Sequence, residues 1–95
     1  MFMVLLKFSH NKSRAGELME LHNQWLTQGF DDGVFLVSGS LQPKRGGAIL
    51  AHNCSKEALV ERVSRDPFVA EQVVDSEILE VTPNKASREM TFLLP

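Results

Sequence analysis

The segment Phe2–Phe8, FMVLLKF, limits how this chain can fold more than any other, because six of its seven residues are apolar. Its length, its two aromatic residues and its β-branched valine are typical of a β-strand. A strand that is apolar on both sides needs cover on both faces. The segment therefore predicts a sheet with helices on one face and a second apolar contact on the other.

Periodicity divides the next part of the chain into a helix and a hairpin. Apolar residues three and four positions apart predict a helix over Leu18–Gly29, with Ser13 as its N-cap and the final glycine as its C-terminal stop. We expect strands over Val34–Gln42 and Ala48–Asn53. The polar, glycine-containing segment Pro43–Gly47 is predicted to be the hairpin loop between them.

The second half of the chain begins with two helix-start signals. Ser55 is expected to cap a helix over Lys56–Arg65, and Asp66, followed by proline, is expected to cap a short helix that ends near Gln72. A fourth strand is predicted over Glu77–Thr82. The apolar stretch Met90–Leu94 is expected to add an edge strand.

The resulting order, β-α-β-β-α-β plus a tail, predicts an α+β fold of the ferredoxin-like type. In this fold a four-stranded antiparallel sheet carries both helices on one face, so the other face remains bare. We expect residues 1–95 to form one domain, with a core over 1–82 and a tail over 83–95. Because a bare apolar sheet face needs a partner, we predict a sheet-to-sheet homodimer, with further assembly left open and the tail a candidate to cross onto the other protomer.

Composition argues against several classes of function. Ten basic and 12 acidic residues give a net charge of −2 with no basic stripe, so we expect no nucleic-acid partner. The strands Phe2–Phe8 and Ala48–Asn53 also lack the exposed aromatic and basic residues of RNA-binding ferredoxin-like domains. No apolar stretch approaches the ~20 residues that span a bilayer. A single cysteine, Cys54, fits a reducing compartment, and we expect a cytoplasmic protein.

His22 is the most informative single residue, because it shares the apolar face of its predicted helix with Leu18, Trp25 and Leu26. An imidazole there is either a general base or a packed histidine that donates one hydrogen bond to a backbone carbonyl. Asp66 has an equally simple structural explanation as an N-cap. The cap and a bond to an imidazole are compatible if each carboxylate oxygen accepts one of them.

Two further patterns leave alternatives open. Ser38-Gly39 in the middle of a predicted strand indicates either space beside His22 or a β-bulge. His52-x-Cys54 places two metal-binding side chains together, but zinc needs three or four ligands, and no second pair is present. We therefore expect no metal and no cofactor.

Five motifs follow one another at characteristic spacing: His22-x-x-Trp25-Leu26-x-x-Gly29, Ser38-Gly39, Gly46-Gly47, Ser55-Lys56-Glu57-Ala58 and Asp66-Pro67-Phe68. Their order resembles that of the YCII-related family within the dimeric α/β-barrel superfamily, over residues 1 to about 82. In that family an arginine often precedes the histidine by about one helical turn. Here those positions hold Leu18 and Met19 instead.

The resemblance implies a His-Asp pair, His22 and Asp66, in a pocket between the sheet and the helices. It further implies a lyase or isomerase that transfers a proton on a small hydroxylated aromatic or lactone-like metabolite. His22 would move the proton and Asp66 would orient the ring. The alternative is a non-catalytic, dimeric small-ligand-binding or stress-related module. The residues expected to contact the ligand are Trp25, Ser38, Gly39 and Phe68.

Overall fold

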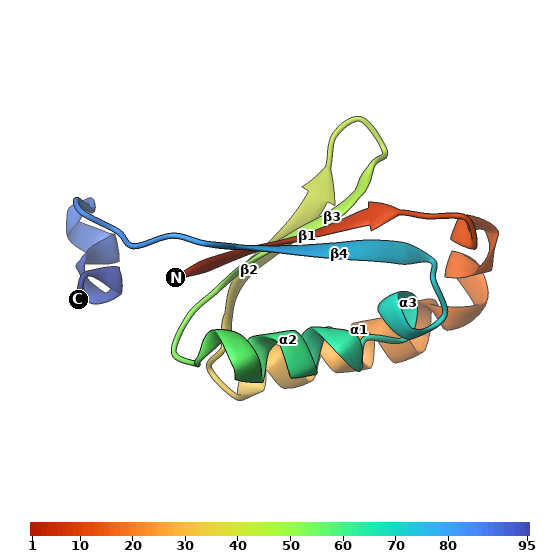
Figure 1. Ribbon diagram of the computed structural model, residues 1–95, viewed down its shortest axis with the longest axis horizontal. Coiled ribbons are helices and arrows are strands. Elements are labelled where there is room, and N and C mark those ends of the chain that lie inside the picture. Colours follow the sequence, from red (N-terminus) through yellow and green to blue (C-terminus); the bar gives the residue numbers. More distant parts are fainter.

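Two layers make up the fold, a four-stranded antiparallel sheet and a layer of helices that covers one of its faces (Figure 1). The computed structural model describes all residues from 1 to 95. The strand order is β2-β3-β1-β4, with every neighbouring pair antiparallel. This is the ferredoxin-like arrangement, so the predicted fold class is confirmed. None of the helices is both long enough and apolar enough to cross a membrane.

The elements agree with the predicted order, with one short helix added before the first long one and one in the tail. They are β1 (Phe2–Phe8), η1 (Lys12–Arg14), α1 (Ala15–Asp31), β2 (Phe35–Leu41), β3 (Gly46–Ala51), α2 (Lys56–Ser64), α3 (Pro67–Ala70), β4 (Val74–Glu80) and η2 (Arg88–Leu93).

Strands β3 and β4 both start earlier than predicted, because pairing with the central strand β1 decides where they begin. Leu6 of β1 lies opposite Gly47 on one side and Ser76 on the other. The predicted turn glycine Gly46 is therefore the first residue of β3. Its φ of +130° and its position against the Leu6 carbonyl leave no room for a Cβ atom.

The boundaries of α1 also differ from the prediction. Ser13 is not its N-cap, because that residue belongs to the preceding 3₁₀ turn, and the helix starts without a side-chain cap. Gly29 does not stop the helix, which continues to Asp31. The left-handed glycine that follows the helix is Gly33, with φ +75°. Gly29 lies inside the helix because its missing side chain makes room for the ring of Phe35.

The two predicted helix starts in the second half are confirmed. The Ser55 hydroxyl accepts a hydrogen bond from the Ala58 N–H, at 3.1 Å. The Asp66 carboxylate accepts one from the Phe68 N–H, at 3.0 Å. Both side chains satisfy backbone donors that have no partner inside the helix.

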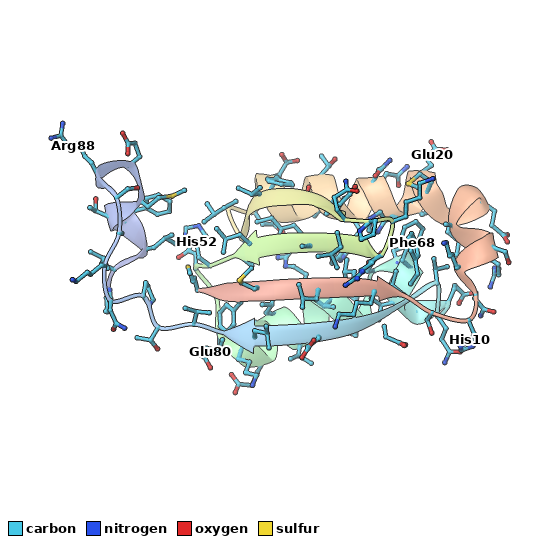
Figure 2. All side chains as sticks on the ribbon, turned by 90° about the horizontal axis from the view of Figure 1, so that it is seen from above. His10, Glu20, His52, Phe68, Glu80 and Arg88 are labelled. Atoms are coloured by element: carbon cyan, nitrogen blue, oxygen red, sulfur yellow. The ribbon has the colours of Figure 1, made fainter.

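The predicted edge strand over Met90–Leu94 is wrong, because this segment forms the 3₁₀ helix η2. The main chain of Val81 still exchanges hydrogen bonds with Met1, at 2.9 and 3.0 Å, and Pro83 then has no N–H to extend the ladder. The tail consequently stands beyond the end of the sheet (Figures 1 and 2). Its Phe92 ring meets the His52 ring edge-on, with centroids 5.6 Å apart.

The two faces of the sheet have different surroundings. On the helix side, Val4 and Leu6 of β1 are buried in the core with Ile49 of β3. On the outer side, which faces the viewer in Figure 2, one register row crosses all four strands with apolar side chains only. The residues of this outer row, in strand order, are Val37, Leu50, Met3 and Leu79.

We expect Gly29→Ala to destabilise the protein by about 1–3 kcal/mol, because the new methyl group would overlap the buried Phe35 ring. Gly16→Ala is the matched control in the same helix, since a Cβ atom there meets nothing within 4 Å. That change should stabilise the protein by about 0.5–1 kcal/mol. Urea unfolding measures both values, and equal effects of the two substitutions would contradict the packing at Gly29.

Candidate active site

His22 and Asp66 are in direct contact, although 44 residues separate them in the chain. The His22 Nδ1 atom lies 2.7 Å from the Asp66 Oδ1 atom. The Asp66 carboxylate is completely buried, and only 11% of the His22 side chain is exposed. In a neutral imidazole whose Nδ1–H donates to this carboxylate, Nε2 carries no hydrogen, as a base requires. The hydrogen-bond partner of His22 is thus the Asp66 carboxylate and not a backbone carbonyl.

Asp66 performs the capping role and the imidazole contact with one oxygen atom. Its Oδ1 atom accepts from both the Phe68 N–H and the His22 ring. Our expectation that the two oxygens would share these roles is not met, because Oδ2 is buried without a hydrogen-bond partner in the protein. An unpaired buried acceptor typically costs about 1–3 kcal/mol.

The plane of the imidazole is set by aromatic contacts. The Phe68 ring stacks on His22 with centroids 4.0 Å apart and an interplanar angle of 6°. Trp25 lies farther away, at 5.8 Å. Because Phe68 follows Asp66 by two residues, one tripeptide supplies both the hydrogen-bond partner and the stacking partner of His22.

A cavity of about 310 Å³ opens beside His22, between α1 and the sheet. This volume is at the lower end of the range for small-molecule sites, and the walls are largely apolar, as in most such sites. His22 is the only acidic or basic side chain in the lining. The lining residues are Leu6, Phe8, Met19, His22, Asn23, Leu26, Ser38, Gly39, Ser40, Gly46, Gly47, Ala48, Ile49, Phe68 and Val74.

The structure brings most of the predicted site residues to this cavity. Ser38, Gly39 and Phe68 are in the lining, and Asp66 is directly behind His22. Trp25 is not in the lining. Its Nε1–H donates to the Arg62 carbonyl at 2.9 Å, and its ring packs edge-on against Phe35, so it faces α2 and the core.

Several lining residues were not predicted, and two of them had a signal in the sequence. Met19 precedes His22 by three residues, which places it on the same helix face. Ser40 follows Ser38 by two residues, so both point to one side of the strand. Leu6 and Phe8 had no such signal, because only the register of β1 brings them to this end of the sheet.

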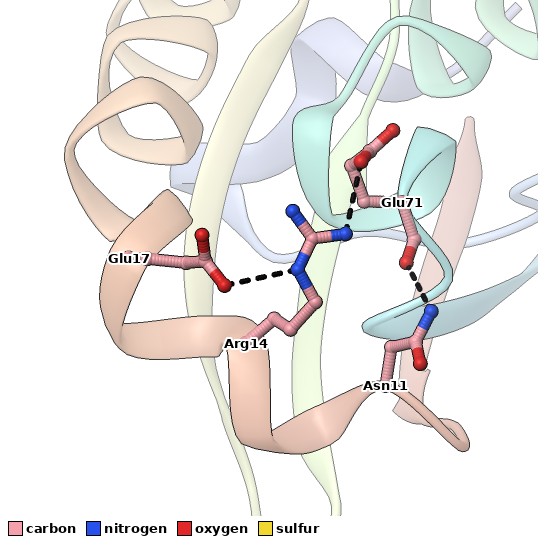
Figure 3. Close-up of polar contacts among 4 residues, drawn as sticks. All are labelled: Asn11, Arg14, Glu17 and Glu71. Carbon is pink, nitrogen blue, oxygen red and sulfur yellow. Dashed lines mark hydrogen bonds and ion pairs between the residues drawn. The ribbon is translucent and has the colours of Figure 1, made fainter.

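A polar cluster connects the N-terminal end of α1 to Glu71, the residue that follows α3 (Figure 3). The Arg14 guanidinium donates to Glu17 at 2.9 Å and to Glu71 at 3.0 Å. The Asn11 side chain donates to the Glu71 carbonyl at 2.9 Å. The hydrogen bond with Glu17, then the one with Glu71, raises the pKa of Arg14 above its ordinary value. This cluster connects the two elements that carry His22 and Asp66.

The second candidate pattern, His52-x-Cys54, does not extend to a set of metal ligands. His52 contacts Phe92 of the tail, whereas Cys54 borders a separate depression next to Arg62. No three histidine, cysteine or acidic side chains come together in a group able to hold a metal ion.

Two comparisons relate the chain to known proteins. The sequence matches the YCII-related domain over residues 1–83. A similar solved structure is 5-chloro-2-hydroxyhydroquinone dehydrochlorinase (TftG) from Burkholderia phenoliruptrix AC1100, in complex with 2,5-dihydroxybenzoquinone. The TM-score is 0.68 at 12% sequence identity, over 85% of this chain and 93% of that chain. No protein of curated function matches the sequence significantly.

The fold and the cavity define a ferredoxin-like α+β protein with a small-molecule-sized hollow between its two layers. Because the domain match extends over most of the sequence, the chain belongs to the YCII-related family. The likeness to the dehydrochlorinase, at its low identity, establishes the shared fold alone.

Burial raises the pKa of the Cys54 thiol, and the nearby Arg62 charge offsets part of this effect. A raised pKa leaves less thiolate at a given pH, so we expect iodoacetamide to react with the native protein more slowly than with the urea-unfolded chain. The midpoint of the rate against pH should be higher for the native protein. Arg62→Gln should raise it further, and a native midpoint at or below the unfolded one would contradict the burial effect.

Proposed function

We propose that this protein is a proton-transfer lyase or isomerase acting on a small hydroxylated aromatic or lactone-like metabolite. The observation that carries the proposal is the single ionisable side chain of the cavity, His22, in contact with the buried carboxylate of Asp66. The TftG structure provides independent support, since that fold holds a dihydroxylated quinone and its enzyme is named for removal of hydrogen chloride from a hydroxylated ring.

In the proposed mechanism, His22 accepts a proton from the substrate through Nε2. The Nδ1 atom is occupied by Asp66, so the second nitrogen is the one free to react. When Nε2 takes the proton, the imidazole becomes positively charged next to a carboxylate that stabilises it. The proton can then return to another atom of the substrate, in an isomerisation, or leave with an expelled group, in an elimination.

Asp66 would act by orienting His22 rather than by touching the substrate, since it is absent from the cavity lining. The parallel Phe68 ring limits rotation of the imidazole about its own axis. The apolar walls reduce the water around the reacting atoms, which strengthens electrostatic interactions there. We place the reaction in the cytoplasm, in accordance with the single cysteine of the chain.

The test of this proposal is His22→Gln, assayed with a panel of hydroxylated and chlorinated aromatic compounds and small lactones. The readouts are chloride release and exchange of substrate hydrogen for solvent deuterium. We expect kcat to fall by about 10²–10⁴-fold, the range for loss of a general base. Asp66→Asn should also lower kcat, while the Asn side chain can still cap α3.

Gln24→Ala is the matched control for this test, because Gln24 is exposed on the opposite side of α1 and does not line the cavity. Its activity should equal that of the unchanged protein. Ligand binding without turnover by the unchanged protein would instead support the non-catalytic binding module. Full turnover by a folded His22→Gln variant would exclude the mechanism.

We also propose that the outer face of the sheet packs against a second copy of the chain. The outer row, Val37, Leu50, Met3 and Leu79, is apolar across all four strands, and Leu5 continues it towards the middle of β1. Met3, Val37 and Leu79 are 40%, 55% and 43% exposed in the single chain. Removing this area from water favours association, and a two-fold axis lets one surface cover its own copy.

Light scattering during size-exclusion chromatography tests the dimer. The unchanged protein should elute with twice the 10.6 kDa mass of one chain. Leu79→Asp should shift it towards the monomer, because a buried charge without a partner is unfavourable at an apolar interface. Val60→Asp, at a 49%-exposed valine on the helix side, should leave the dimer intact. A monomeric unchanged protein at micromolar concentration would rule out this interface.

A further inference from the structure

A β-bulge in strand β2 decides which of its side chains reach the cavity. Phe35 lies opposite Ala51 and Val37 lies opposite Leu50, so Leu36 is an extra residue in the pairing. One extra residue reverses the alternation of side chains beyond it. Without the bulge, Val37 and Gly39 would face the helices. With it, Ser38 and Ser40 share the face of their pairing partners Ile49 and Gly47.

The two serine hydroxyl groups have no hydrogen-bond partner in the protein. Ser38 and Ser40 are both part of the cavity lining, on the sheet side, while His22 lines it from α1. Two residues along a strand span about 6.8 Å. This spacing is comparable to the separation of substituents on opposite sides of a six-membered ring. A hydroxyl group can donate and accept, so it suits a phenol or a carbonyl oxygen alike.

We propose that Ser38 and Ser40 form a recognition pair that binds two oxygen substituents of one ring and presents that ring to His22. The inference rests on the proposed function for the kind of substrate, and it adds the element that selects among such substrates. The other sheet residues of the lining are apolar or glycine, namely Leu6, Phe8, Gly39, Gly46, Gly47, Ala48, Ile49 and Val74. Side-chain hydrogen bonds from the sheet can therefore come only from the serines.

With two serines in its lining, the cavity should prefer ligands that carry two oxygen substituents. A site that hydrogen-bonds a substrate hydroxyl favours it over the analogue that lacks it, and the preference is modest where the site's own groups are exposed, as Ser38 and Ser40 are. With two serines, a ring with two opposed hydroxyl groups makes both contacts and a phenol makes one. The cavity should accordingly prefer hydroquinone to phenol, which has the same six-carbon ring and lacks only the second hydroxyl group.

The experiment is a chemical-shift titration of the full chain with hydroquinone and with phenol, followed at the His22 ring. In the unchanged protein, hydroquinone should bind about 3- to 10-fold more tightly than phenol, the value of one hydrogen bond of ordinary strength. Ser38→Ala and Ser40→Ala should each lower hydroquinone affinity by a similar factor. The double substitution should remove the preference, because hydroquinone then loses two serine contacts and phenol loses one, so phenol affinity should fall by a single factor of about 3 to 10.

Ser76→Ala is the matched control, because Ser76 lies on β4 in the same register row as Ser40 and does not line the cavity. Its titrations should match those of the unchanged protein. Equal affinities for the two rings, no binding of either ring, or a preference that survives the double substitution would each overturn the recognition pair.

The titration is independent of turnover, so the two proposals fail separately. A hydroquinone preference that depends on the serines, in a protein without catalytic activity, would support the recognition pair and contradict the enzyme. Turnover that depends on His22 but on neither serine would support the enzyme and contradict the recognition pair.

Discussion

The buried carboxylate of Asp66 is the group on which the arrangement of the site depends. It is wholly inaccessible to water, and its Oδ1 atom accepts hydrogen bonds both from His22 of α1 and from the first turn of α3. A buried charge is tolerated only when hydrogen-bonding partners surround it, so the His22 ring and the Phe68 N–H stabilise the fold as well as forming the site. The chemistry proposed for His22 and the packing of α1 against α3 therefore cannot be changed independently.

The tripeptide Asp66-Pro67-Phe68 concentrates three structural roles in one turn. Its aspartate caps α3 and bonds His22, its proline occupies the first helical position, where no N–H is needed, and its phenylalanine stacks on the imidazole. The three residues therefore position the imidazole, the carboxylate and the stacking ring relative to one another. The Arg14 cluster fixes the other end of this segment through Glu71, so the connection to α1 is made at both ends of α3.

Local signals in the sequence predicted the parts of the fold that local interactions determine. Ser55 and Asp66 cap their helices because each satisfies a backbone donor within three residues. The strand boundaries were less predictable: Gly46 and Gly47 have turn propensity, but pairing with Leu6 and Lys7 draws them into β3. Gly29 resembled a helix stop in the sequence, because the residues around it do not indicate that the Phe35 ring packs where its side chain would be. Register and close packing are properties of the assembled sheet and helices, which no short window contains.

In the site, too, some residues could be predicted from local sequence patterns and others depend on the assembled sheet and helices. His22 was identifiable because an imidazole interrupts an apolar helix face, and its partner was identifiable through the family resemblance. Trp25 was assigned to the pocket on the same helix face, yet it is one turn closer to the C-terminus, where α1 meets α2, and its indole donates to Arg62. Ser40 reaches the cavity together with Ser38 because the bulge at Leu36 reverses the face to which each later side chain of β2 points. The position of His22, the residue proposed to react, is thus set by helix periodicity, and that of the serines proposed to select the ligand by one extra residue in an edge strand. Changes of specificity in such a fold can therefore arise in β2 while the histidine and its carboxylate stay in place.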